Sequence, residues 1–355
     1  MGLALGIDTS NYKTSIALVD VNDNIIYDDR RFLRVPEGGR GLRQQEAFFQ
    51  HVTRLPRMIR PLLDTVSEMG ESIDIISVSD KPRNIADSYM PCFEAGVSAG
   101  EILSSSLNIP LKRFSHQEGH ISAGKRFTPL MNTKEFVAFH FSGGTTEALK
   151  CTFDNIERPK IEIIGGTKDI SFGQLIDRVG VAMGYGFPAG EELDNGAIRS
   201  GSGDLVYDSK KTSKEDIPTI NLKERFSGID FDLDRFKIRV NKTYINLSGV
   251  ETSILRYLKE LSHGGSLTDE TKDNISLALF DEIGNAIVKM ANTIKDDTGI
   301  NDFLFVGGVS SSSYIRSYIE KKSKKINLYS NFASPDLASD NAIGIAFLGG
   351  DSIWL

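Results

Sequence analysis

The stretch LALGIDTSNYKTSIALV at residues 3–19 decides the fold that this sequence predicts. It begins with an apolar run at residues 3–7, continues through a polar turn at residues 8–11, and returns as a β-rich run at residues 14–19. This pattern indicates two strands that are joined by a polar turn, and residues 24–32 predict a third strand.

The same pattern returns near the start of the second half of the chain. Residues 136–141 predict a strand, residues 142–146 a small-residue turn, and residues 147–152 the returning strand. Two such units, similar in pattern rather than in letters, favour a duplicated α/β architecture. A buried strand at residues 302–306 ends in two glycines, at the kind of junction where open α/β sheets bind ligands.

Helical spacing of apolar residues is found in three long segments. Residues 46–69 predict a helix that Pro56 and Pro61 are expected to kink or break. Residues 93–107 predict a second helix, and residues 271–295 a long amphipathic one. Helices that alternate with buried strands agree with the α/β class.

The composition is that of an ordinary globular protein of 355 residues, with 40% apolar and 25% charged residues. A net charge of -7 argues against a generic polyanion binder, so an RNA partner would need a local basic patch. Residues 201–242 contain many cations, but a solvated surface insertion is the better interpretation. Cys92 and Cys151 predict buried thiols rather than a disulfide or a zinc ribbon. No segment resembles a signal peptide or is long enough to span a bilayer, so we expect a cytoplasmic protein.

Two of the five histidines lie in the segment HQEGH at residues 116–120. His116 and His120 are four residues apart and share one face of a helix, so both imidazoles can reach one metal ion. By spacing alone, a pair of surface or helix-capping histidines is the better interpretation. The segment SDN at residues 339–341 becomes relevant to this pair through a family resemblance.

Glycine-rich turns after strands let backbone N–H groups approach a phosphate. Such turns are predicted at residues 142–146, 165–167 and 307–308, and three of them in one α/β chain favour a nucleotide site. Each turn alone is common, and the sequence contains neither a P-loop nor a Rossmann fingerprint. Gln174 and Asp177 would share a helix face that could bind a ribose, although a solvated helix surface explains their spacing equally well.

Seven separated segments along the chain combine small, polar and charged residues. They are IDTS (7–10), HQEGH (116–120), SGGTT (142–146), GQLID (173–177) ahead of YGFPAG (185–190), LSGVET (247–252), VGGV (306–309) and SDN (339–341). Their order is that seen in the TsaD family, the tRNA threonylcarbamoyladenosine transferases, so the chain resembles this family over nearly its whole length.

The resemblance implies a duplicated actin-like ATPase fold (ASKHA, RNase H-like). That fold has two lobes, with a nucleotide and metal site in the cleft between them. The first lobe would comprise residues 1–130 and a C-terminal helix at about residues 338–355. The second lobe would comprise residues 131–337, with a helical and charged insertion at about residues 190–270.

Carried over position by position, the resemblance implies that His116, His120 and Asp340 bind a divalent metal, described as iron, zinc or magnesium. It also implies that ATP, ADP or threonylcarbamoyl-AMP is bound. The residues implied for the nucleotide are Ser142, Gly143, Gly144, Thr145, Gly173, Gln174, Asp177, Gly190, Gly308 and Ser312. Transfer of threonylcarbamoyl from its adenylate to a tRNA adenosine is the implied reaction. Besides the nucleotide and tRNA, the candidate partners are proteins of the TsaB or TsaE type and a second copy of the chain, and no membrane is implied.

Several departures from the family pattern fall at the active centre. The first turn of the family continues with an acidic pair, where this chain has Tyr12 and Lys13. Because those acids are thought to act in catalysis or acceptor placement, their loss removes the obvious general base. Arg83 and Lys81 replace a glycine turn and could hold a carboxylate or phosphate, although solvated charges also explain them. Asp8, Tyr12, Lys13 and Arg83 are therefore the candidate catalytic residues.

These departures favour a TsaD-like paralogue over the housekeeping transferase. Three functions stay open: the family reaction, a related carbamoyl or acyl transfer or nucleotide hydrolysis with another acceptor, and a non-catalytic nucleotide-binding regulatory subunit. Peptidase activity is the weakest alternative, because the histidine pair lacks the glutamate of the H-E-x-x-H zincins.

Overall fold

The computed structural model describes residues 2–10, 13–35, 42–85, 87–154, 158–202, 221–227, 230–262, 265–338 and 342–354. The chain forms two compact units: Met1–Lys134, Cys151–Ile161 and Ala333–Leu355 make up unit 1, and Glu135–Lys150 and Glu162–Phe332 make up unit 2. Each unit is described by itself. Within the residues described, no helix is long and apolar enough to cross a membrane.

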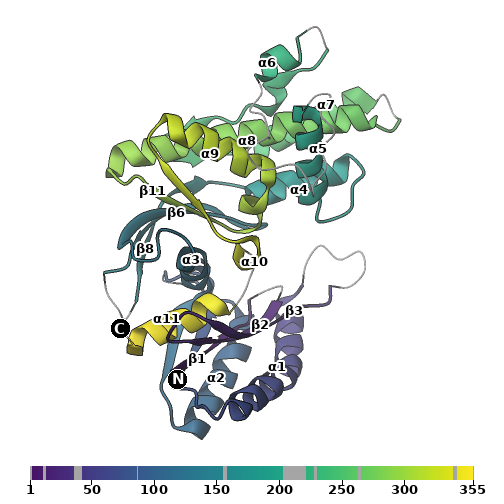
Figure 1. The fold of residues 1–355 in the computed structure, drawn as a ribbon. Helices are drawn as coiled ribbons and strands as arrows, with labels where there is room; N and C mark the ends of the chain where they lie inside the picture. The colour runs from purple at the N-terminus through teal and green to yellow at the C-terminus, as the bar shows by residue number, and fades with distance from the viewer. Residues whose placement is uncertain are drawn as a thin grey trace. The chain divides into compact units, whose positions relative to one another are not determined.

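Unit 1 is built on a five-stranded sheet with the order β3-β2-β1-β4-β5. Strands β1, β2 and β3 of this sheet are labelled in Figure 1. Its strands are β1 (Leu3–Asp8), β2 (Lys13–Asp20), β3 (Ile25–Phe32), β4 (Ile75–Lys81) and β5 (Leu111–Ser115). Strand β1 is antiparallel to β2 and parallel to β4, which is in turn parallel to β5. The carboxyl ends of β1, β4 and β5 therefore meet at one edge of the sheet.

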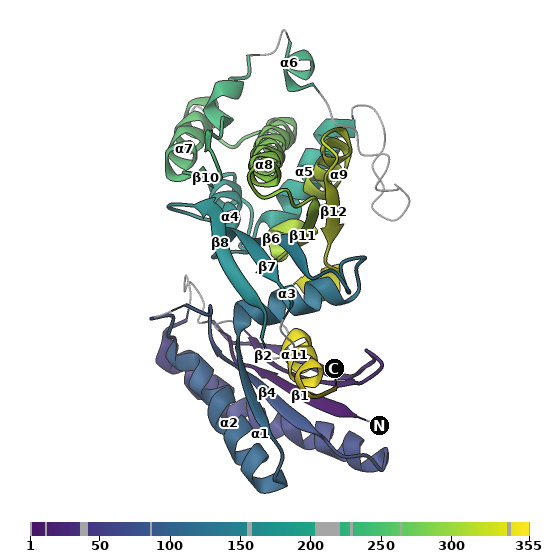
Figure 2. The same cartoon turned by 90° about the vertical axis from the view of Figure 1, so that its left-hand side faces the viewer.

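Helices cover both faces of this sheet (Figure 2). They are α1 (Gln44–Glu68), α2 (Glu94–Leu107), α3 (His116–Arg126), α10 (Pro335–Ala338), α11 (Ile343–Trp354) and the 3-10 helix η1 (Pro91–Phe93). Leu5 and Ile7 of β1 pack in a core with α1 and α2, whereas Ala4 packs in the opposite core with α11. A Cβ on Gly6 would meet the backbone N of Ala346 at 2.7 Å, so this glycine allows α11 to lie directly on the sheet.

Helix α1 is continuous through Pro56 and Pro61, so the expected break is wrong, whereas the alternative of a kink stays a prediction. One face of the helix buries Leu55, Met58 and Leu62 in the core beneath the sheet. Burial of this apolar face supplies the stability that the missing proline N–H bonds remove.

Unit 2 contains a seven-stranded sheet with the order β12-β11-β6-β7-β8-β10-β9. Its strands are β6 (Glu135–Phe141), β7 (Thr146–Thr152), β8 (Lys160–Thr167), β9 (Val240–Asn241), β10 (Tyr244–Ile245), β11 (Asp302–Val306) and β12 (Tyr329–Phe332). Strand β11 is parallel to both β6 and β12. The order β8-β7-β6-β11-β12 repeats the order β3-β2-β1-β4-β5 of unit 1, which is the predicted duplication.

The helices of unit 2 are α4 (Phe172–Ala182), α5 (Gly190–Ser202), α6 (Leu222–Arg225), α7 (Ser248–Ser262), α8 (Asp269–Thr298) and α9 (Ser313–Lys325), with the 3-10 helices η3 (Leu233–Phe236) and η4 (Gly308–Ser311). Helix α8 contains the predicted amphipathic segment and extends it at both ends. It begins after Thr268, whose side chain accepts a hydrogen bond from the amide of Thr271, and ends at the left-handed Gly299. Buried residues of α8 such as Ile283 and Ile287 belong to the main core of unit 2.

The glycine pair at positions 165 and 166 is a second correction, because it lies inside strand β8 and not in a turn. The amide of Gly166 donates to the carbonyl of Thr243 at 2.9 Å, and Gly166 has a φ of 143°. A Cβ on Gly165 would meet that same carbonyl. These glycines let the chain that precedes β10 approach β8, so they serve strand pairing and leave two glycine turns for a ligand.

Candidate functional site

The carboxyl edge of the sheet in unit 1 brings together three residues that are far apart in sequence. Asp8 ends β1, Ser79 lies near the end of β4, and His116 follows β5 directly. The hydroxyl of Ser79 donates to Oδ1 of Asp8. Nδ1 of His116 lies 3.2 Å from Oδ1 and 3.1 Å from Oδ2 of the same carboxylate. Asp8 is fully buried, so these contacts compensate for its lost hydration.

Helix α3 begins at His116 because the residues around it form a capping box. Ser115 Oγ accepts from the amide of Glu118 at 3.3 Å, and Glu118 Oε2 accepts from the amide of Ser115 at 2.6 Å. Arg158 binds both oxygens of the buried Glu118 carboxylate, at 2.7 and 2.8 Å, and this contact raises the pKa of Arg158. The sequence interpretation did not single out Glu118, although the Ser-x-x-Glu spacing indicates this cap.

The two histidines of α3 face one another through their ring nitrogens. Nε2 of His116 and Nε2 of His120 are 3.0 Å apart, with ring centroids 4.4 Å apart in an edge-on arrangement. Two nitrogens that each lie about 2.1 Å from one metal ion are separated by roughly 3.0–3.4 Å. Because Asp8 holds Nδ1 of His116 as a donor, Nε2 is left with its lone pair toward His120. The pair therefore fits two ligands of a divalent metal.

The third predicted ligand, Asp340, lies outside the described residues. Across the described ranges, no group of three or more His, Cys, Asp and Glu side chains is arranged to hold a metal. The complete ligand set of His116, His120 and Asp340 thus stays a prediction.

Tyr12, a predicted catalytic residue, also lies outside the description, but its neighbour Lys13 opens β2. Lys13 is only 7% exposed, and its Nζ lies 4.5 Å from the ring centroid of Phe32 on β3. A cation over an aromatic face is stabilised by the ring quadrupole. At this position the chain therefore has a packed ammonium group and no carboxylate.

Arg83 follows β4 close to the first turn of α3. The carbonyl of Pro82 accepts from the amide of Gln117 at 3.0 Å, which ties this loop to α3. The amide of Arg83 donates to Ser88 Oγ at 3.1 Å, and the side chain is half-buried. The structure thus brings the loop of Arg83 to the same edge of unit 1 as the histidine pair.

His51 on α1 was not expected to belong to this region. Its Nδ1 lies 2.9 Å from Thr14 Oγ1 on β2, and its side chain is fully buried. Burial lowers the pKa of His51 to about 4, against the attraction of the nearby Asp8 carboxylate. His51 is therefore neutral at physiological pH. A single polar residue on an apolar helix face was the only sequence signal.

In unit 2, the turn between β6 and β7 presents glycine backbone to open space. Ser142 Oγ accepts from the amides of Gly144 and Thr145 at 3.3 and 3.0 Å, and the Ser142 amide donates to the Thr145 carbonyl at 2.8 Å. Gly143 and Gly144 are exposed, and a Cβ on either would meet nothing within 4 Å. A turn of this kind can lie against a phosphate without a side chain in the way.

Helix α4 starts directly against this turn. Ser171 Oγ donates to the Gly143 carbonyl at 2.8 Å. A Cβ on Gly173 would meet the Ser142 carbonyl oxygen at 2.6 Å and the Gly143 Cα at 2.7 Å. Only glycine permits this approach, which places the N-terminus of α4 and its positive dipole end at the turn.

Gln174 and Asp177, which form the predicted ribose-binding face, each accept a hydrogen bond from a backbone amide. Only part of each side chain is therefore left for a ligand. Gln174 Oε1 accepts from the Ser171 amide at 3.1 Å as part of a capping box. Asp177 Oδ1 accepts from the Ala189 amide at 2.9 Å, just before Gly190 opens α5, and burial raises the pKa of Asp177. A ligand would use the Gln174 amide nitrogen and the second oxygen of Asp177.

The other glycine turn of unit 2 reaches the same edge of the sheet. Gly307 has a φ of 93°, and a Cβ there would meet the Phe141 carbonyl carbon at 2.7 Å, so the ends of β11 and β6 lie together. Gly308 next to it is exposed. Ser312 Oγ donates to Asp194 Oδ1 at 2.5 Å, which holds the start of α9 to α5.

Asp194 is a site residue that the sequence interpretation missed. Its oxygens also accept from the amides of Ser313 and Tyr314 at 2.8 and 3.0 Å. Burial raises the pKa of Asp194, and these bonds oppose the rise. No local sequence spacing links a residue of α5 to the N-terminus of α9, so only the fold reveals the contact.

Comparison with known proteins shows the family to which this chain belongs. The family TsaD, described as tRNA N6-adenosine threonylcarbamoyltransferase, matches residues 33–347. This chain belongs to the TsaD family. A protein named tRNA N6-adenosine threonylcarbamoyltransferase from Thermosipho africanus (strain TCF52B) is 25% identical over 350 residues, 98% of this chain and 93% of that protein. The protein of the same name from Thermotoga neapolitana is 25% identical over 346 residues, 97% of this chain and 92% of that protein.

Solved structures support the fold of this TsaD-family chain. Full-length HypF in its phosphate- and nucleotide-bound form has a TM-score of 0.50 at 14% identity, over 99% of this chain and 55% of that chain. HypF from T. kodakarensis has a TM-score of 0.51 at 14% identity, over 99% of this chain and 47% of that chain. The chain thus spans about half of each HypF chain. With the repeated strand order, these matches confirm the duplicated actin-like fold.

Proposed function

We propose that this TsaD-family chain transfers a threonylcarbamoyl group from threonylcarbamoyl-adenylate to the N6 amine of a tRNA adenosine. The observation that carries the proposal is the pair His116 and His120, whose Nε2 atoms converge at 3.0 Å. In the reaction the N6 amine attacks the carbamoyl carbon and a C–N bond forms. The bond from that carbon to the phosphate oxygen breaks, AMP leaves, and the amine loses a proton.

The residues of unit 1 would hold a divalent metal through His116, His120 and Asp340. Such a metal, when bound, neutralises charge on the phosphate of the leaving group. Asp8 fixes the orientation of the His116 ring through Nδ1. The ion pair of Glu118 with Arg158 fixes the first turn of α3. The protein's contribution is thus a preformed pair of nitrogen ligands.

The residues of unit 2 would bind the adenylate portion of the donor. Gly143 and Gly144 leave open space for a phosphate, and the N-terminus of α4 adds favourable electrostatics. Gln174 and Asp177 retain polar atoms that can bind ribose hydroxyls. Gly308 leaves open space beside the end of β11. These features support binding of a nucleotide without a P-loop.

The test is transfer with the purified full chain, synthetic threonylcarbamoyl-adenylate, a divalent metal and unmodified tRNA. Nucleoside mass spectrometry should detect modified adenosine. His116→Ala and His120→Ala should each lower the rate by roughly 100-fold or more, because the metal loses a direct ligand. Thermal unfolding would show that the variants are folded. Absence of product from the wild-type chain, beside an active control transferase, contradicts the proposal.

Lys13 favours a second candidate function, carbamoyl-type transfer to another acceptor or nucleotide hydrolysis. Its ammonium packs on Phe32 where the family pattern has an acid that is thought to act in catalysis or in placing the tRNA adenosine. AMP release from the donor, or phosphate release from ATP, should be measured with and without tRNA. Release that depends on tRNA supports the first function, and release that does not supports the second. Nucleotide binding without any turnover would indicate a regulatory subunit.

A further inference from the structure

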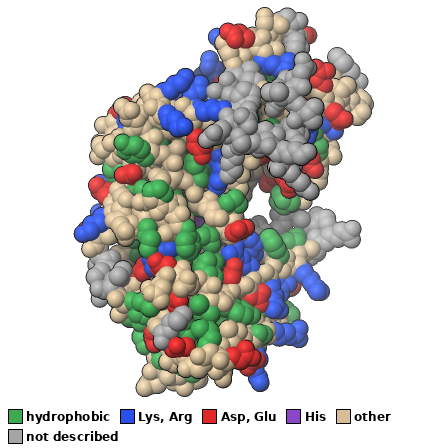
Figure 3. Space-filling view, viewed as in Figure 1, with side chains coloured by type: hydrophobic (Ala, Val, Ile, Leu, Met, Phe, Trp, Pro, Cys, Tyr) green, Lys and Arg blue, Asp and Glu red, His purple; other side chains and the backbone are tan. Residues whose placement is uncertain are grey.

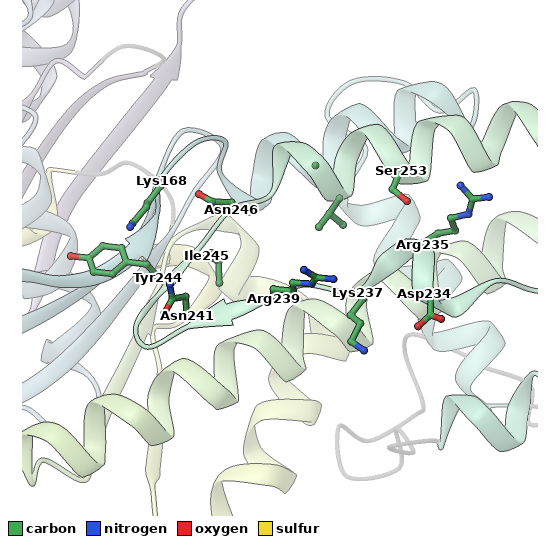
Figure 4. Close-up of a pocket in the computed structure, with 12 residues that line it drawn as sticks. Lys168, Asp234, Arg235, Lys237, Arg239, Asn241, Tyr244, Ile245, Asn246 and Ser253 are labelled. Atoms are coloured by element: carbon green, nitrogen blue, oxygen red, sulfur yellow. The ribbon is translucent and has the colours of Figure 1, made fainter.

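Outside the two candidate sites, unit 2 contains a groove that is rich in positive charge (Figure 4). The groove lies among η3, the β9–β10 hairpin and the start of α7, and has a cavity volume of about 460 Å³. Its charged lining consists of Lys168, Arg235, Lys237, Arg239 and Asp234. We call this the basic groove, because its lining contains four cationic side chains and one acidic side chain.

Three of these four cations form no ion pair with the residues that the structure describes. Arg235 pairs with Asp232 at 2.9 Å and with Glu260 at 3.2 Å. Lys168, Lys237 and Arg239 are exposed, and none of them forms an ion pair with any residue in the described ranges. The uncompensated charge of the basic groove therefore resides on these three residues.

The backbone that carries Lys237 and Arg239 is anchored to the core of unit 2. Phe236 is fully buried and Ile238 is 3% exposed, so the residues alternate between core and solvent. The amide of Ile238 also donates to Glu282 of α8 at 3.3 Å. Lys237 and Arg239 thus both lie on the solvent-exposed side of an anchored segment. A backbone that is already ordered loses less entropy on binding than a free loop.

The groove is better suited to an extended anion than to one small phosphate. The N-terminus of α7, which lines it, is already occupied, because Asp169 accepts from the amides of Leu247 and Ser248 at 2.8 and 3.0 Å. Along the groove, exposed Asn241 and Asn246 offer amide donors between the cations. A row of separate donors on an open surface matches a chain of phosphates.

The charge of the groove contrasts with that of the whole chain. The sequence contains 48 acidic and 41 basic residues, and the face in Figure 3 carries both kinds. The lining of the basic groove, with four cations and one acid, therefore has a charge opposite to that of the whole chain. In a chain of net charge -7, only such a patch can attract a polyanion.

We infer that the basic groove binds the phosphodiester backbone of tRNA, outside the histidine pair and the glycine turns. This inference rests on the proposed function, since tRNA is the proposed acceptor. Contacts of this kind position the nucleic acid without reading its sequence. Lys237 and Arg239 each contact a phosphate, and Lys168 extends the positive charge toward β8.

The test measures equilibrium binding of labelled unmodified tRNA to the full chain at several salt concentrations, without donor. The variant is Lys237→Ala with Arg239→Ala. The matched control is Lys259→Ala with Lys289→Ala, which removes the same charge from exposed positions on α7 and α8. Loss of two phosphate contacts should lower the slope of log affinity against log salt by about 1.4–1.8. It should weaken binding roughly 20-fold near 0.15 M salt, while the control stays within about twofold.

Equal affinity and salt slope in the groove variant and the wild-type chain would overturn the inference. Equal losses of tRNA affinity in both double variants would also overturn it. So would a wild-type chain that does not bind tRNA, which is the result expected if the groove binds an acidic protein instead. Unchanged ADP binding shows that the groove variant is folded. A wild-type chain that binds tRNA through the groove but makes no modified adenosine refutes the proposed function alone. A chain that modifies tRNA with the groove variant unimpaired in binding refutes this inference alone.

Discussion

Replacement of Asp8 by asparagine should weaken metal binding by the histidine pair without removing a ligand. Asp8 is fully buried and its two oxygens lie 3.1 and 3.2 Å from Nδ1 of His116. In the variant, the side-chain amide oxygen at position 8 can still accept the hydrogen bond from Ser79. The side-chain NH₂ group then faces Nδ1 of His116. That arrangement selects the tautomer with its proton on Nε2, where the metal would bind.

The expected magnitude follows from the role of the carboxylate. Loss of a partner that orients a histidine ligand costs about 10- to 100-fold in metal affinity, or roughly 1.4–2.7 kcal/mol. Direct loss of the ligand in His116→Ala should cost more. Asp8→Asn should therefore fall between the wild-type chain and His116→Ala.

The assay is titration of the metal-free chain with Co²⁺ and Zn²⁺, followed by visible absorption and by calorimetry. Asp80→Asn is the matched control. Asp80 is a partly buried carboxylate of the neighbouring strand β4, and its charged neighbours are Lys81, Arg158 and Arg113 rather than the histidine pair. The control should bind metal like the wild-type chain. Asp8→Asn affinity within twofold of wild type, alongside a large loss in His116→Ala, would refute the proposed orientation of His116 by Asp8.

Three further predictions concern the surroundings of the two sites. Glu118→Gln should lower the free energy of unfolding by about 1–3 kcal/mol in urea titrations, because Arg158 loses its charged partner. Burial lowers the pKa of His51 in the folded state to about 4, against about 6.5 in the unfolded state. The unfolded state therefore binds a proton more readily, and the free energy of unfolding falls as the pH drops below about 6.5. His51→Gln should therefore lose about 2 kcal/mol less than wild type between pH 7 and pH 5, and an equal loss would exclude this residue as the cause. Gly173→Ala should weaken ADP binding in calorimetry through its clash with the β6–β7 turn, whereas Gly186→Ala, which meets nothing within 4 Å, should not.

The features that sequence could predict are those that depend on local patterns. The strand–turn–strand units, the strand at β11 and the amphipathic helix α8 all follow from periodicity. The position of His116 and His120 on one helix face follows from their spacing. Local patterns gave a wrong prediction where a contact with a distant segment of the chain determines the local structure. Two adjacent glycines in β8 looked like a turn, but they serve the close approach of the Thr243 carbonyl.

The contacts that give the sites their chemistry depend on pairing between distant strands. Asp8 and His116 are 108 residues apart, and they meet because β1, β4 and β5 are parallel neighbours in one sheet. Asp194 and Ser312 are 118 residues apart and meet through packing of α5 on α9. Neither pair has a spacing that a single sequence reveals, so only the assembled fold identifies Asp8 and Asp194 as partners.

The duplicated fold explains why the two candidate sites differ in the ligands they favour. In each unit, the first strand of the repeat lies between an antiparallel and a parallel neighbour in the sheet order, where its carboxyl end opens toward ligands. In unit 1 that end is a buried carboxylate beside two imidazoles, a donor set that attracts a cation and repels a phosphate. In unit 2 the equivalent end continues into Gly143 and Gly144, with the N-terminus of α4 beside them, a set that favours an anion. The same backbone junction thus carries the candidate metal site in one unit and the candidate phosphate site in the other. It follows that Asp8→Asn should lower metal affinity with little effect on ADP affinity measured without metal. Gly173→Ala should lower ADP affinity with little effect on metal affinity.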